Sequence, residues 1–165
     1  MSLHVYSTGL TTRFRGITRR EGALIGGPAG WAEFSPFLEY DAPTALPWLR
    51  AAIEAASQPP PGVVRDSVPV NVTVPAVGPE RARAIVEASG GCTTAKVKVA
   101  EPGQTLADDV ARVRAVRAAM GPAARVRIDA DGGWQLDAAE AALRALAEFD
   151  LDYADGATRA DTTVA

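Results

Sequence analysis

Two lysines separated by one residue, Lys96 and Lys98, are the side chains whose type and spacing most directly suggest chemistry. They lie in TAKVKVA, residues 94–100, where they alternate with apolar residues. This is the pattern of a β-strand whose two lysines project from one face. Two close ammonium groups lower each other's pKa, so one of them can act as a neutral base near pH 7. If that face meets water, the same alternation describes an ordinary half-exposed strand.

Carboxylates follow two later segments that also have strand character. Asp129 ends the apolar stretch 124–129, and Asp155 ends LDYAD at 151–155. An aspartate at a strand end is a natural ligand for Mg²⁺, which prefers carboxylate oxygens. The D-x-D-G of IDADGGW also resembles the start of a calcium loop. An aspartate nucleophile of the phosphotransferase kind is a further interpretation, although such enzymes usually place it on their first strand.

Composition and charge argue against several classes of partner. The 165 residues carry a net charge of −3, which does not suggest nucleic acid or an anionic membrane surface. The single cysteine, Cys92, cannot form an internal disulfide framework. The N-terminus lacks a basic segment followed by an apolar run, and no 18-residue apolar span occurs. We therefore expect a cytoplasmic protein.

The chain has two regions of different texture. Residues 1–66 combine short strands and glycine-rich turns with a helix at 41–57, and QPPPG at 58–62 is typical of a linker. Beyond it, we predict strands at 68–76, 94–100, 124–130 and 151–155, with helices at 79–91, 105–121 and 136–149. Such alternation implies a parallel sheet, either open and doubly wound or part of a (β/α)8 barrel. Parallel sheets are usually covered on both faces, which favours an enclosed lysine face.

Local signals predict caps and core positions. Thr105 with Asp108 is typical of a capping pair, and Asp137 is expected to cap the helix at 136–149. The arginine-rich segment 11–21 is expected at a solvated hairpin tip. The expected apolar residues of the first region are Trp31, Phe34 and Phe37, together with a helical stripe of Trp48, Leu49, Ala52, Ile53 and Ala56.

These segments resemble the enolase superfamily, and within it the actinobacterial type of o-succinylbenzoate synthase. The matching stretches are TTRFRGITRREG, GPAGWAEFSPFLEY, VNVTVPA, TAKVKVAE and RIDADGGW, which occur in the expected order within residues 4–153. The resemblance implies an α/β protein with an α+β capping domain at 1–66. It also implies an incomplete TIM-type (β/α) barrel at 67–165, and so favours the barrel over the open sheet.

The resemblance implies roles for individual residues. Lys98 would take the proton next to the substrate carboxylate and then help hydroxide leave, while Lys96 would keep Lys98 partly neutral and add positive charge. Asp129 and Asp155 would bind Mg²⁺, and Arg15 would contact the substrate from a loop over the active-site mouth. The reaction would be syn dehydration of 2-succinyl-6-hydroxy-2,4-cyclohexadiene-1-carboxylate to o-succinylbenzoate, a carbon–oxygen lyase step on the route to menaquinone.

The sequence departs from the family pattern at several positions. Asp131 stands where the family often has asparagine, and Asp155 aligns with a glutamate of a Y-V-E-Q-P-like segment. Family-like sequence is expected to stop after Tyr153. The 98 residues from 68 to 165 are fewer than the roughly 250 of a complete barrel. These departures predict a truncated chain of about three and a half βα units with impaired activity.

Two alternatives remain open at this point. The chain could belong to an N-acylamino acid racemase or dipeptide epimerase of the same superfamily, because these enzymes use similar lysines and metal. A non-catalytic fragment that associates through an open sheet edge is the other alternative.

Overall fold

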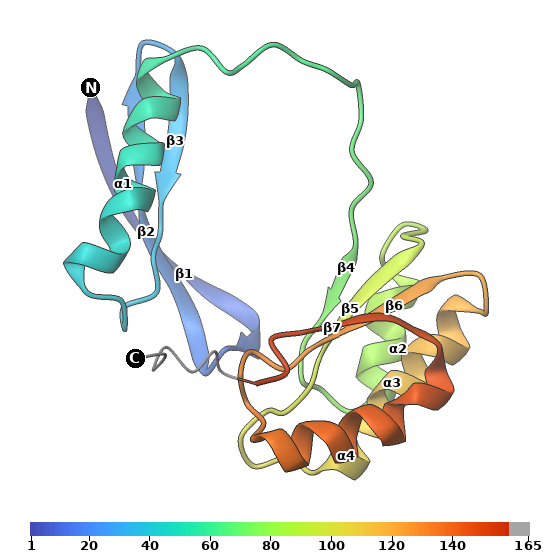
Figure 1. Ribbon diagram of the computed structural model, residues 1–165. Coiled ribbons are helices and arrows are strands. Elements are labelled where there is room, and N and C mark those ends of the chain that lie inside the picture. Colours follow the sequence, from blue (N-terminus) through green and yellow to red (C-terminus); the bar gives the residue numbers. More distant parts are fainter. Residues whose placement is uncertain (159–165) are drawn as a thin grey trace, which may run out of the picture. The chain divides into compact units, whose positions relative to one another are not determined.

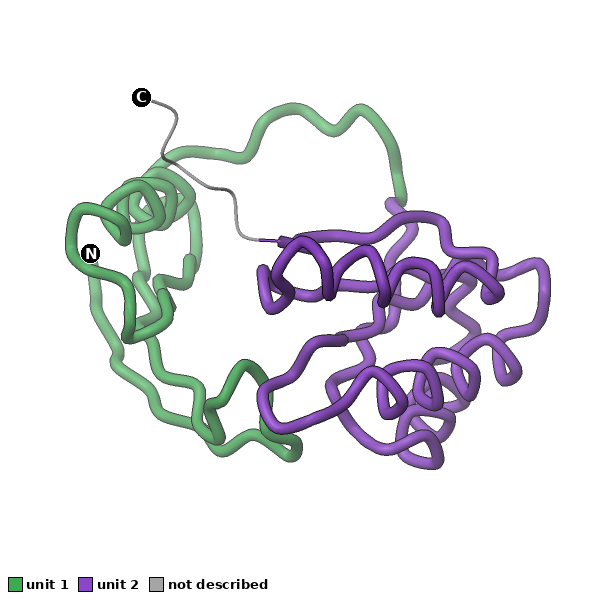
Figure 2. The backbone as a smooth tube through the Cα atoms, turned by 60° about the horizontal axis from the view of Figure 1, so that its bottom comes forward, with its two compact units in different colours: residues 1–67 green, residues 68–165 purple. Residues whose placement is uncertain are grey.

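The computed structural model describes residues 1–158, and its backbone divides into two units (Figures 1 and 2). The first unit is residues 1–67 and the second is residues 68–165. Residues 159–165 lie outside the described part of the chain.

The N-terminal unit is a three-stranded antiparallel sheet with one helix. Its elements are β1 (Ser2–Phe14), β2 (Ile17–Gly27), β3 (Gly30–Phe34) and α1 (Ala42–Ser57). The strands lie in the order β1-β2-β3. Arg15 and Gly16 join β1 to β2 and both have positive φ, at 48° and 79°, as in a type I′ hairpin turn. The predicted hairpin in the arginine-rich segment is therefore confirmed.

Helix α1 packs on this sheet through small residues. Its Ala52 and Ala56 form a buried cluster with Ile25 of β2. A Cβ at Gly27 would lie 2.3 Å from the carbonyl oxygen of Ala56, so glycine permits this close approach.

Some of the apolar residues predicted for the core of this unit are buried, and others are exposed. Trp48 and Ile53 are 44% and 42% exposed, because the helix meets the sheet through its alanines. Trp31 is 63% exposed, so its assignment to the core is wrong. Its side chain alternates with Ala32 and Phe34 along β3, and those two residues pack on the buried cluster.

The C-terminal unit is a parallel sheet with intervening helices. Its strands are β4 (Val72–Val74), β5 (Thr94–Lys98), β6 (Arg125–Asp129) and β7 (Leu151–Asp155), and its helices are α2 (Pro79–Glu87), α3 (Leu106–Met120), α4 (Leu136–Leu146) and the 3-10 turn η1 (Ala147–Phe149). Every predicted element is present, although the first strand is shorter than the expected 68–76.

The strand order β4-β5-β6-β7 identifies the type of parallel sheet. Each strand pairs with the next in the chain, so right-handed crossovers place every connecting helix on the same face. A doubly wound sheet would reverse direction and cover both faces. This arrangement is that of part of a (β/α) barrel.

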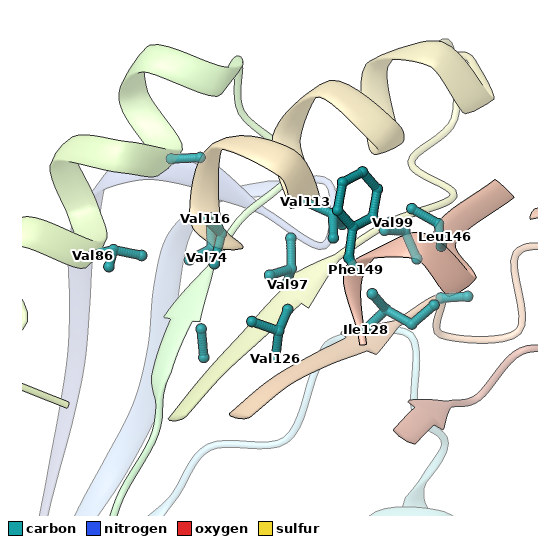
Figure 3. Packing of buried hydrophobic residues seen from close by; sticks show 13 residues of the cluster. Val74, Val86, Val97, Val99, Val113, Val116, Val126, Ile128, Leu146 and Phe149 are labelled. Atoms are coloured by element: carbon teal, nitrogen blue, oxygen red, sulfur yellow. The ribbon is translucent and has the colours of Figure 1, made fainter. Parts of the chain in front are cut away.

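The core of this unit lies between the sheet and its helices (Figure 3). Fully buried strand residues meet buried residues of all three helices, and the cluster includes Val74, Ala82, Val86, Ala95, Val97, Val113, Val116, Val126, Ile128, Leu146 and Phe149. Within the described residues, the helices of this unit pack on one face of the sheet, whereas the general rule for parallel sheets led us to expect a covered lysine face as well. Because strand side chains alternate, Lys96 and Lys98 project from the face opposite the helices.

The predicted helix caps are right for one helix and wrong for the other. At α3, the Thr105 side chain accepts from the Asp108 backbone N–H, and the Asp108 carboxylate accepts from the Thr105 N–H, which is a full capping box. At α4, Gln135 is the N-cap residue and makes no side-chain cap bond. Asp137 instead lies in the first helical turn, where its charge interacts favourably with the helix dipole.

Thr105→Ala is expected to lower the free energy of unfolding by about 1 kcal/mol, because it removes the side-chain cap of α3.

The same cap makes stability depend on pH, since the Thr105 backbone N–H and hydroxyl lower the pKa of Asp108. This carboxylate therefore stabilises the fold above the ordinary aspartate pKa, and its contribution is lost as pH falls through the lowered pKa. Urea denaturation at neutral and strongly acid pH measures both effects. Thr105→Ser is the control, and an equal loss in both variants would contradict the cap.

The helices described within residues 1–158 include none that could span a lipid bilayer.

Candidate active site

Lys96, Lys98 and Asp129 converge at the carboxyl end of the parallel sheet. The Nζ atoms of both lysines lie 2.8 Å from the same carboxylate oxygen, Oδ2 of Asp129. The Asp129 side chain is 7% exposed, that of Lys98 13% and that of Lys96 29%. The ammonium groups are thus close to each other and to a nearly buried anion.

Strand register produces this convergence. Lys98 on β5 pairs with Asp129 on β6, and Asp129 pairs with Asp155 on β7. Residues paired in a parallel sheet project from the same face, so the three side chains form a row across neighbouring strand ends. Lys96 lies on that face one strand repeat before Lys98. The structure therefore brings together four of the five predicted site residues.

The electrostatics of the site are dominated by Asp129. Burial is the largest influence and raises the pKa of Asp129, but the hydrogen bonds and positive charges of Lys96 and Lys98 together outweigh it and lower the pKa overall. The hydrogen bond to Asp129 raises the pKa of Lys96 despite its partial burial. The expected mutual lowering of the lysine pKa values is therefore wrong for Lys96, because the carboxylate between the ammonium groups compensates their repulsion.

Asp129→Asn is expected to lower the pKa of Lys96. The substitution keeps a similar shape but removes the negative charge that stabilises the protonated amine, leaving burial and the charge of Lys98. NMR titration of the Lys96 side chain in the two proteins measures the shift. An unchanged pKa would show that Asp129 does not control this lysine.

Asp131, the departure from the family pattern, lies beside the same cluster. Its backbone N–H donates to Oδ1 of Asp129 at 3.1 Å, and its Oδ2 lies 3.7 Å from Nζ of Lys98. Its φ of 54° is in the left-handed region, which aspartate and asparagine tolerate better than most residues. Either residue therefore suits this turn, and the aspartate adds a negative charge near Lys98.

The donors at the strand ends fit part of a magnesium site. Asp129 and Asp155 offer carboxylate oxygens on one face of neighbouring strands. Mg²⁺ is commonly held by one or two carboxylates, with water and substrate completing the shell. Within the described range 1–158, no group of three or more Asp, Glu, His or Cys residues is placed to hold a metal. Among residues 1–158, Asp129 and Asp155 are the predicted metal-binding carboxylates that the sheet brings to neighbouring strand ends.

Arg15, the fifth predicted site residue, belongs to the N-terminal unit. Its guanidinium lies 4.3 Å from the centre of the Phe37 ring and 3.7 Å from a carboxylate oxygen of Glu39. It also lines a cavity of about 640 Å³ with Arg20 and Trp48. The substrate contact expected for Arg15 stays a prediction.

Sequence reasoning missed a buried ion pair close to the lysines. Asp109 and Arg112 of α3 are 2% and 1% exposed, and Arg112 Nη1 donates to Asp109 Oδ1 at 2.7 Å. Opposite charges three residues apart in a helix were the available signal. That spacing is also common on solvated helix faces, so the sequence alone did not distinguish this pair.

Comparisons with protein families match both units. A family model described as "Enolase N-terminal domain-like" matches residues 5–56, and one described as "Enolase C-terminal domain-like" matches residues 79–165. The second match covers more than half of the chain and continues past Tyr153.

A curated relative shows more specific similarity. The chain is 57% identical over 155 residues to o-succinylbenzoate synthase of Thermobifida fusca, which covers 94% of this chain and 49% of that protein. The chain thus spans about half the length of the curated relatives that it matches.

Solved structures support the fold. The L-Ala-D/L-Glu epimerase from Bacillus subtilis matches with a TM-score of 0.73 at 20% identity, covering 98% of this chain and 61% of that one. An o-succinylbenzoate synthase from Thermosynechococcus elongatus, with magnesium in its active site, matches with a TM-score of 0.57 at 19% identity, covering 98% and 62%. At these identities the likeness establishes the architecture alone.

Proposed function

The chain belongs to the enolase superfamily, and on that basis we propose that it carries the catalytic base of an o-succinylbenzoate synthase. The reaction is the syn dehydration of 2-succinyl-6-hydroxy-2,4-cyclohexadiene-1-carboxylate, a carbon–oxygen lyase step in menaquinone biosynthesis. The 57% identity to the Thermobifida fusca enzyme supports this substrate over those of the racemases and epimerases. The proposal includes a cytoplasmic location.

The observation that carries the proposal is the meeting of Lys98, Lys96 and Asp129 at one strand end. The Lys98 side chain is the less exposed of the two, and Lys98 pairs with Asp129, which in turn pairs with Asp155. Catalytic groups of β/α barrels gather at this end of the sheet. An amine so placed can exchange a proton with a substrate bound against the polar face.

Lys98 performs both proton transfers in the proposed reaction. In its neutral form it takes the proton from the ring carbon that bears the carboxylate. The same ammonium then gives this proton to the hydroxyl on the neighbouring carbon, which departs as water while the ring becomes aromatic. Because the elimination is syn, both groups leave from one face, and a single side chain can serve as base and acid.

Lys96 and the aspartates supply the charges around that proton. Asp129 raises the pKa of Lys96, so Lys96 remains an ammonium and attracts the substrate carboxylate. Asp129 and Asp155 are the residues that would hold Mg²⁺, and the ion would supply positive charge where negative charge develops on that carboxylate. The hydrogen bonds of Asp129 to both lysines also fix the direction of their side chains.

Incubation of the 165-residue chain with Mg²⁺ and the cyclohexadiene substrate tests the proposal. Loss of the diene absorbance above the uncatalysed rate, with formation of o-succinylbenzoate, is the expected result. A parallel assay follows loss of optical activity in an N-acylamino acid, which is the reaction of the alternative. Racemisation without dehydration would overturn the proposed substrate. A folded monomer without either activity would contradict a catalytic role for this chain.

A further inference from the structure

We propose that Asp109 and Arg112 are positioning residues that fix the backbone at the end of β5 and so hold the Lys98 side chain in the position required for proton transfer. The role in catalysis rests on the proposed function, whereas the role in holding Lys98 does not. Both residues lie on α3, which covers the face of the sheet opposite the lysines, and they act through the backbone of β5.

The carbonyl group of Lys98 itself is one of the acceptors of Arg112. Nη1 of Arg112 donates to this oxygen at 2.9 Å and to Asp109 at 2.7 Å. The guanidinium also donates through Nε to the carbonyl oxygen of Val77 at 2.6 Å, and through Nη2 to Oε1 of Gln104. Arg112 therefore joins the segment that follows β4 to the last residue of β5.

Asp109 holds the other side of the same strand end. Its Oδ2 accepts a hydrogen bond from the backbone N–H of Ala100 at 3.0 Å. Ala100 has a φ of 59°, a left-handed conformation that alanine rarely adopts. Such strain persists only where the surroundings impose it, and it concentrates near functional sites. The carboxylate of Asp109 thus holds a strained residue two positions after Lys98.

Two further contacts close this network. Nε2 of Gln104 donates to the carbonyl oxygen of Ala76 at 2.9 Å, which adds a second link between the exits of β4 and β5. A Cβ at Gly133 would lie 2.9 Å from the Cβ of Ala100, so the turn after β6 packs directly on the strained residue. The backbone beyond Lys98 is therefore held from three neighbouring segments.

Stability alone does not account for this pair. Replacing a buried ion pair with apolar residues of similar volume is often neutral or stabilising, so the charges are weak evidence for a stabilising role. Arg112 and Asp109 instead place directional hydrogen bonds on the two peptide groups that flank Val99. Both groups lie at the end of the sheet where barrel enzymes carry their chemistry.

The same helix offers a matched arginine at the opposite end of the sheet. Arg117 donates to the carbonyl oxygens of Phe149 and Asp150, which precede β7, and to those of Gly121 and Ala124, which precede β6. Like Arg112, it joins backbone segments through several hydrogen bonds, but far along α3 from Lys98. Arg117→Met is therefore the control for Arg112→Met.

The test compares the two variants at a temperature where circular dichroism shows both to be folded. Hydrogen exchange of the Ala100 amide and the rate of reductive methylation of Lys98, resolved from Lys96 by peptide mass spectrometry, report on the strand end. In Arg112→Met both rates should rise by about fivefold or more, because the backbone opens locally. In Arg117→Met both should stay within about twofold of the parent.

Equal changes in the two variants, or none in either, would overturn the proposal. If Arg112→Met does not fold, Gln104→Ala provides the comparison, because this exposed residue links Arg112 to Ala76 without a buried charge. A smaller rise in the same two rates is then expected, and an unchanged Ala100 amide would overturn the proposal.

Enzyme kinetics separate this inference from the proposed function. If the chain dehydrates the substrate, Arg112→Met should lower kcat by about tenfold with little change in KM. The catalytic amine of Lys98 is still present in this variant, but it is no longer held in the correct position. If the chain shows no dehydratase activity, the proposed function is wrong. The exchange and methylation rates then still decide whether Asp109 and Arg112 hold Lys98.

Discussion

Replacing Lys98 with arginine is expected to lower the kcat of dehydration by about 10²–10⁴-fold. Arginine keeps the positive charge and can still donate to Asp129, but its guanidinium does not give up a proton in proteins. If Lys98 acts as base and acid, charge and hydrogen bonding do not replace it. Steady-state kinetics, with circular dichroism to confirm folding, measure the effect.

Lys96→Arg is the matched substitution on the same strand face. Because Lys96 is proposed to act through its charge, this variant should lose no more than about tenfold in kcat. Both variants replace a lysine with an arginine, and the two positions lie two residues apart on the same face of β5. A larger loss in Lys96→Arg than in Lys98→Arg would reverse the assigned roles, and equal losses would remove the distinction between the two lysines.

Leu146→Ala is expected to lower the free energy of unfolding by about 2–5 kcal/mol. The side chain is fully buried in the cluster between α4 and the sheet, so the substitution leaves a cavity there. Leu143 lies one helical turn earlier on α4 and is 37% exposed. Leu143→Ala should therefore cost less than about 1 kcal/mol. Urea denaturation of both variants gives the comparison, and similar costs would mean that the apolar side of α4 is misassigned.

The lysine face could be predicted because strand side chains repeat every two residues. Alternation in TAKVKVA placed Lys96 and Lys98 together, and the β/α spacing placed Asp129 and Asp155 at neighbouring strand ends. Register between strands then follows from the parallel pairing. These are local patterns, which sequence expresses directly. The capping box of Thr105 and Asp108 belongs to the same class.

The remaining features depend on how elements meet. The exposure of Trp48 follows from the close approach of α1 at Gly27, which no periodicity shows. The raised pKa of Lys96 follows from a carboxylate 33 positions later in the chain. The burial of Arg112 follows from carbonyl acceptors at Val77 and Lys98, which only the packed sheet brings together. Such non-local contacts leave no regular spacing in the sequence.

The pairing of each strand with the strand before it also bears on how the protein is made. Each of the strands β5 to β7 pairs with the strand that is synthesised just before it. The strands β4 to β7 can therefore assemble in the order in which they leave the ribosome. Contacts between segments close in the chain also favour rapid folding. In a nascent chain, Lys96, Lys98 and Asp129 can therefore come together before β7 has emerged from the ribosome.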